Sequence, residues 1–142
     1  MKRVNNITPI STILSDAGVE IVELHKWDQY LRETWEYQFA KNLSTIEKKK
    51  IHMYQFLWHL FSYKRVECLK NSEAKTAFND LLKRSCYLFY QNQSQAFLIE
   101  DSNKIKAEHF EQENDICIVD RDFRWTYVQT HEEQCGPYFL LR

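Results

Sequence analysis

The chain has 142 residues, enough for one domain with a sizeable core, and 15% of them are aromatic. Its formal net charge of −1 creates no overall field that would attract nucleic acid or a membrane surface, so we expect neither as a partner. No stretch approaches the roughly 20 apolar residues of a membrane span, and only two Gly and two Pro argue against a disordered chain.

The N-terminal residues are basic, but no apolar segment follows them, so they do not form a secretory signal. We therefore expect a cytoplasmic protein with reduced, partly buried cysteines: Cys68, Cys86, Cys117 and Cys135. We also expect no cofactor. The charge is uneven. Residues 85–142 hold 10 acidic and 5 basic side chains, which favours a partner with a basic surface.

The first part of the chain is predicted to be mainly helical over residues 18–84, after a loose lead-in over 1–17. A short strand is expected at 19–24. Large apolar residues four apart predict a helix over 27–43: Trp27, Leu31, Trp35, Phe39 and Leu43.

Two more helices are expected before residue 84. Ser44 and Glu47 have the spacing of a capping box and predict a second helix over 45–63. Its first turns carry Lys48, Lys49 and Lys50, which we interpret as a solvated face. Apolar residues at helical spacing predict the third helix over 72–82.

The second part, residues 85–142, is predicted to be mainly strand. Short aromatic and aliphatic runs indicate the strands, at 86–90, 96–100, 116–119, 124–130 and 138–141, and one or two helical turns are expected at 105–111. Together these elements predict a single α+β domain: about three N-terminal helices packed on a C-terminal, mainly antiparallel β-sheet of four to five strands. Its core should join the helices to the sheet through Trp35, Phe39, Trp58, Phe61, Leu88, Ile118 and Trp125.

The segment 120–139 concentrates the candidate functional residues. Cys135 as a thiol nucleophile, His131 as its base and Glu132 as the group that orients the base would suit a small thiol enzyme. The alternative is that His131 and Glu132 only shape the turn that leads to Gly136 and Pro137.

Three other sets of residues are candidates for a functional site. Cys117, His131 and Cys135 are zinc-ligand types, but no paired Cys or His spacing supports them, so we expect no metal. His52 and His59 lie seven apart in the second helix and are expected at the boundary of the core. Trp125 and Tyr127, with His131, could instead offer an aromatic surface to a protein partner, although such rings more often face the interior of a sheet.

Several segments carry a resemblance to a known family: 27–36, 57–69, 77–80, 86–91 and above all R-W-T-Y-V-Q-T-H-E…C-G-P-Y-F over 124–139. From about residue 19 onward the chain resembles a family of small uncharacterised proteins from Gram-positive, spore-forming bacteria that carries a domain-of-unknown-function label. The resemblance implies a bacterial cytosolic protein and brings no catalytic residues. The pattern around 120–132 is also similar to segments of bacterial immunity and antitoxin-like proteins.

The sequence shows no ordered catalytic spacing that would indicate an enzyme. Our leading hypothesis is therefore a non-enzymatic protein-binding module, immunity- or antitoxin-like. The alternative is a small thiol- or metal-dependent enzyme that uses Cys135 and His131.

Overall fold

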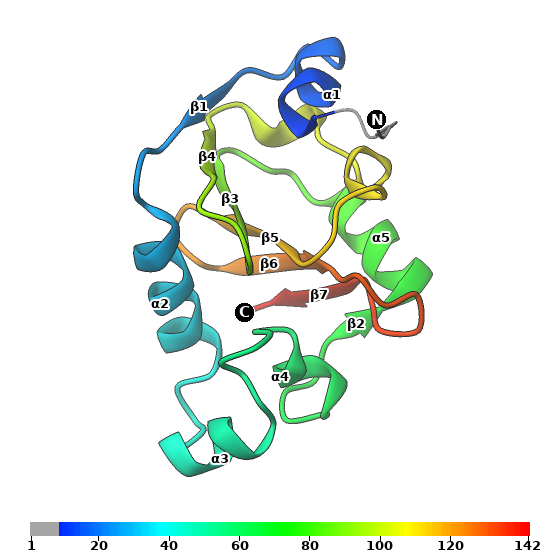
Figure 1. The fold of residues 1–142 in the computed structure, drawn as a ribbon. Helices are drawn as coiled ribbons and strands as arrows, with labels where there is room; N and C mark the ends of the chain where they lie inside the picture. The colour runs from blue at the N-terminus through cyan, green and yellow to red at the C-terminus, as the bar shows by residue number, and fades with distance from the viewer. Residues whose placement is uncertain (1–8) are drawn as a thin grey trace, which may run out of the picture.

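The computed structural model describes residues 9–142, which form an α+β fold around one antiparallel sheet (Figure 1). Within these residues the sheet has seven strands, in the order β1-β4-β3-β5-β6-β7-β2. The same residues contain five α-helices and two short 3-10 helices. The α+β class is confirmed, but the sheet is larger than the four to five strands predicted.

The strands share a continuous antiparallel ladder. They are β1 Ile21–Glu23, β2 Leu69–Lys70, β3 Cys86–Tyr90, β4 Ala96–Ile99, β5 Ile116–Asp120, β6 Trp125–Gln129 and β7 Tyr138–Leu141. The central β5 pairs with β3 through Leu88 opposite Ile118, and with β6 through Ile118 opposite Tyr127. β2 is an edge strand that pairs with only two residues of β7, Tyr138 and Phe139.

Helices cover both faces of the sheet, so the domain has three layers (Figure 1). α1 (Ile10–Asp16), α5 (Asn71–Asp80) and the 3-10 helix η2 (Ala107–Phe110) pack on one face. α2 (Asp28–Phe39) and α4 (His59–Ser62) pack on the other, with α3 (Thr45–Lys50) beyond them at the end of α2. A second 3-10 helix, η1 (Ser102–Lys104), follows β4.

Two apolar cores result, because successive residues of a strand point to opposite faces. Trp35, Phe39, Trp58 and Phe61 form one core with Phe89, Cys117 and Val119. Leu88, Ile118 and Trp125 belong to the other, beside Phe78 of α5. The prediction of a single core that joins all seven residues was therefore wrong. The part of the prediction that groups Trp35, Phe39, Trp58 and Phe61 is confirmed. Leu88, Ile118 and Trp125 pack instead against α5 on the opposite face.

The predicted second helix, 45–63, is interrupted. Its start is confirmed: Ser44 Oγ accepts the N–H of Glu47 at 3.1 Å, and Glu47 Oε1 accepts the N–H of Ser44 at 2.9 Å. α3 nevertheless ends at Lys50, and the next residues form turns in which His52 has a φ of +58°. A left-handed residue cannot continue a right-handed helix, so α4 is a separate turn of four residues.

Other boundaries also differ. α1 occupies part of the predicted lead-in, of which residues 1–8 lie outside the described residues. α2 ends at Phe39 rather than near residue 43, while α5 lies within two residues of the third predicted helix. No helix within residues 9–142 is long and apolar enough to cross a membrane.

Candidate functional site

The candidate site lies where the start of β5 meets the end of β6. These strands are antiparallel neighbours, with Ile116 opposite Gln129, so the residues just outside them come together. Asp115 precedes β5 and His131 follows β6. The imidazole Nδ1 of His131 lies 2.9 Å from Asp115 Oδ1, which also accepts the backbone N–H of His131 at 3.2 Å. The pair is an imidazole whose orientation is fixed by a carboxylate.

Asp115 connects this strand end to two other segments. Its Oδ1 accepts the indole N–H of Trp58 at 2.8 Å, and its backbone carbonyl accepts the N–H of Gln91 at 2.9 Å. Gln91 Oε1 in turn accepts the N–H of Leu57 at 2.8 Å. The side chain of Asp115 is almost fully buried and its φ is +55°, a conformation that Asp and Asn adopt more readily than most residues. The turns that precede α4 are therefore held against the sheet.

A cluster of aromatic and imidazole rings surrounds His131. Phe56 lies 5.0 Å from the His131 ring and 5.5 Å from the His59 ring, measured between ring centroids. The buried Trp58 contacts the same rings, with its ring centroid 4.7 Å from that of His59 and 5.7 Å from that of His131. These contacts pack the exposed His131 ring and the half-buried Phe56 and His59 rings on the buried indole.

Two exposed tyrosines extend the cluster. Tyr63 contacts His59 with ring centroids 5.2 Å apart, and Tyr54 contacts His52 at 5.8 Å. His52 is linked back to the cluster because its carbonyl oxygen lies 3.1 Å from His59 Nδ1. We call this set the aromatic–histidine surface: His52, Tyr54, Phe56, His59, Tyr63 and His131.

Cys135 and His131 do not form the thiol–imidazole pair considered from the sequence. The Cys135 sulfur lies 3.4 Å from Glu132 Oε2, and Glu132 Oε1 lies 3.6 Å from His131 Nε2. No hydrogen bond within residues 9–142 joins Cys135 to His131. Burial and the neighbouring Glu132 carboxylate raise the pKa of the Cys135 thiol. Glu132 thus opposes formation of the thiolate that a nucleophile needs.

The zinc set considered from the sequence is not assembled. Cys117 is buried within β5 on the α2 side of the sheet, where burial raises the pKa of its thiol. Across residues 9–142, no three His, Cys, Asp or Glu side chains are arranged to hold a metal ion.

Trp125 and Tyr127 require a correction. They are 4% and 0% exposed and face α5, where Tyr127 stacks on Phe78 with ring centroids 4.3 Å apart. Neither ring offers a surface to a partner. The strand expected at 124–130 is present as β6, but helices cover both faces of this sheet and bury the two rings.

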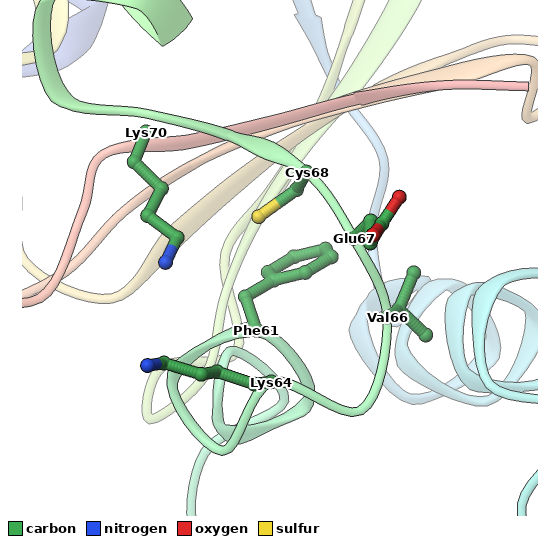
Figure 2. Close-up of a pocket in the computed structure, with 6 residues that line it drawn as sticks. All are labelled: Phe61, Lys64, Val66, Glu67, Cys68 and Lys70. Atoms are coloured by element: carbon green, nitrogen blue, oxygen red, sulfur yellow. The ribbon is translucent and has the colours of Figure 1, made fainter.

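Cys68 lies in a separate hollow of about 390 Å³ between α4 and β2. Figure 2 shows its sulfur between the Phe61 ring and the side chain of Lys70. Burial raises the pKa of this thiol to about 11, although the charge of Lys70 opposes the change. Cys68 therefore has little thiolate at neutral pH and is a poor nucleophile.

The residues that sequence reasoning missed are Asp115, Tyr54, Phe56 and Tyr63. Asp115 follows Asn114 directly before a buried strand, a place where polar residues often have a role, but nothing in the spacing connects it to His131. The three aromatic residues were assigned to a continuous helix, which hid the turns that expose two of them.

The family model described as Domain of unknown function (DUF4275) matches residues 9–139. No curated protein matches the chain. No solved structure matches it either.

Proposed function

The chain belongs to the DUF4275 family, whose function is not defined, and we propose that it is a non-enzymatic protein-binding module. The observation that supports this proposal is the aromatic–histidine surface. Tyr54 is 69% exposed and Tyr63 is 47% exposed, although both are large rings in contact with other rings. Tyrosine is enriched among the residues that dominate binding energy at protein interfaces.

The packing at the centre of the surface also supports binding. Trp58 is held by a hydrogen bond to Asp115 and contacts three rings of the surface: Phe56, His59 and His131. These three rings would therefore lose little side-chain freedom when a partner docks. Imidazole rings add polar atoms that can bond to a partner at the rim of the tyrosines.

We further propose that the partner is a bacterial cytoplasmic protein that this chain caps, in the manner of immunity or antitoxin-like proteins. The resemblance of residues 120–132 to such proteins supports this narrower proposal. The alternative, a thiol enzyme that uses Cys135 and His131, has less support, because Glu132 contacts both side chains and the pKa of the thiol is raised.

A site-specific photo-crosslinker tests the proposed function. The crosslinking amino acid replaces Tyr54 in one version of the protein and Tyr37, an exposed tyrosine of α2, in the control. Each version is expressed in the organism that encodes the chain. We expect a discrete crosslinked protein from position 54 and none from position 37.

A binding measurement then follows with the protein that was crosslinked. The Tyr54→Ala/Tyr63→Ala double variant should bind at least about 10-fold more weakly, as expected for hot-spot residues. A Tyr30→Ala/Tyr37→Ala variant, which removes two exposed tyrosines of α2, should bind normally. Equal crosslinking from positions 54 and 37, or turnover of a substrate that depends on His131, would count against a binding module.

A further inference from the structure

A second surface lies at the opposite end of β5 and β6, away from the aromatic–histidine surface. It consists of two hollows that share Leu81 and Leu141. The first, of about 430 Å³, is largely apolar and lies between the end of α5 and the edge of the sheet. The second, of about 440 Å³, is lined by four arginines: Arg84, Arg121, Arg124 and Arg142. Because two residues line both hollows, we treat them as one groove.

The arginines of this groove lack acidic partners. Within residues 9–142, no carboxylate lies within 4.0 Å of any of the four guanidinium groups. Two carboxylates also line the second hollow, but Asp120 Oδ2 is engaged by the backbone N–H groups of Asp122 and Arg124, at 3.3 and 3.1 Å. Arg142 is bonded to the carbonyl of Gln38 at 3.2 Å. The remaining three guanidinium groups make no hydrogen bond within the described residues.

The arginines gather in this hollow although most of them come from the acidic part of the chain. Residues 85–142 contain five basic side chains, and Arg121, Arg124 and Arg142 all come to this one cavity. They reach it from the β5–β6 turn and the end of β7, while Arg84 precedes β3. Planar guanidinium groups recognise carboxylates through paired hydrogen bonds, so the cavity suits Asp or Glu side chains.

The apolar half of the groove lies along an open strand edge. β2 pairs with β7 only at Tyr138 and Phe139, so Leu140 and Leu141 have no strand on that side within residues 9–142. Leu141 is 58% exposed, and Leu82 at the arginine end is 73% exposed. An unpaired edge beside an apolar hollow is the arrangement that binds extended peptides by strand addition.

We propose that this groove binds an extended segment of a partner protein in which apolar residues lie next to Asp or Glu. The apolar side chains occupy the hollow beside Leu69 and Leu81, and the acidic ones meet Arg84, Arg121 and Arg124. The carboxylates of Asp120 and Asp122 and the exposed leucines favour such a mixed segment over nucleic acid, which presents uniform negative charge. This surface is independent of the proposed function, because it shares no residue with the aromatic–histidine surface.

The test begins with a library of random peptides displayed on phage and selected against the full chain. We expect the selected peptides to share apolar residues next to Asp or Glu. A selected peptide, made with a fluorescent label, should lose at least about 10-fold in affinity for the Arg84→Ala/Arg124→Ala variant by fluorescence anisotropy. The Lys49→Ala/Lys50→Ala variant removes two exposed charges of α3 and serves as the matched control, with affinity unchanged.

Further variants and competitors distinguish peptide binding in this groove from binding elsewhere on the chain, nucleic-acid binding and dimerisation. Leu141→Ser should weaken peptide binding, whereas Tyr54→Ala/Tyr63→Ala should leave it intact. Circular dichroism should show that every variant is folded. The proposal is overturned if no peptide is selected, if selected peptides lack acidic residues, or if they bind the arginine variant equally well. It is also overturned if unlabelled oligo-dT displaces the labelled peptide completely. A dimer of the chain that excludes the peptide, and that Leu141→Ser dissociates, would overturn it as well.

Discussion

The indole Nε1 of Trp58 donates a hydrogen bond of 2.8 Å to Oδ1 of Asp115, which lies 57 positions further along the chain. The same oxygen lies 2.9 Å from the imidazole of His131. One buried carboxylate therefore joins the turns before α4 to the ends of two central strands. Changes at either residue should affect both stability and the aromatic–histidine surface.

Replacing Trp58 with alanine should destabilise the domain severely. The indole is buried in the core on the α2 side, and removing a large buried ring costs about 3–5 kcal/mol. A domain of this size has only about 5–15 kcal/mol of unfolding free energy. Urea denaturation followed by circular dichroism should show a large loss. A melting temperature within a degree or two of the parent would mean that Trp58 is not packed as described.

Asp115 should tolerate asparagine far better than alanine. Asparagine keeps an oxygen that can accept the Trp58 N–H and adopts a positive φ with little strain, whereas alanine provides neither. Leaving a buried donor without a partner costs about 1–3 kcal/mol, so Asp115→Ala should be less stable than Asp115→Asn by at least that amount. Parallel urea titrations measure the difference. Two variants of equal stability would show that the side-chain oxygen at position 115 contributes little to holding Trp58.

Local periodicity was enough to predict most of the fold. Leu31, Trp35 and Phe39 lie on one helix face and are all buried in α2, and the strand runs of the second half correspond to β3, β4, β5, β6 and β7. The break at His52 could not be predicted, because a left-handed residue leaves no trace in apolar spacing. β2 was also missed, since two residues become a strand only through their pairing with Tyr138 and Phe139.

The sites depend even more on distant contacts. His131 was singled out because it follows a strand, but its partner Asp115 lies 16 residues earlier and meets it only because β5 and β6 are neighbours. Trp125 and Tyr127 were considered as a binding surface because aromatic rings dominate the binding energy of interfaces, although such rings more often face the interior of a sheet. A sheet covered by helices on both sides buries both sets of side chains, and composition alone does not distinguish the two arrangements.

The four cysteines should react slowly with thiol reagents in the native protein. Burial raises the pKa of Cys86 to about 12 and that of Cys68 to about 11, and the pKa values of Cys117 and Cys135 are also raised. The reaction with a disulfide reagent is followed at pH 7.5, about one pH unit below the pKa of a free thiol. It should be fastest at the partly exposed Cys135 and Cys68. Cys86 and Cys117 should react only on unfolding. A Cys135 thiol that reacts faster than free cysteine would support the alternative, a thiol enzyme that uses Cys135 and His131.

Lys83 should make stability depend on pH in an unusual direction. Its ammonium is buried at the end of α5, where Nζ donates to the carbonyls of Phe78 at 2.6 Å and Leu81 at 3.0 Å. Burial, helped by the charge of Lys106, lowers the pKa of Lys83 from 10.5 to about 8. Between these values the unfolded chain binds more protons than the native protein, so this residue's contribution to stability rises as the pH increases.

The comparison with Lys83→Met isolates that contribution, because the tyrosines and the other three cysteines affect both proteins alike. The charge of Lys83 does lower the pKa of Cys86, but that pKa is about 12 and lies above the range compared. The unfolding free energy of the parent minus that of the variant should be constant below about pH 8. It should then increase towards pH 10.5, by at most about 1.4 kcal/mol for each pH unit. Urea titrations across this range provide the measurement. A difference that stays flat, or that falls with pH, would show that the Lys83 ammonium is not disfavoured by its surroundings.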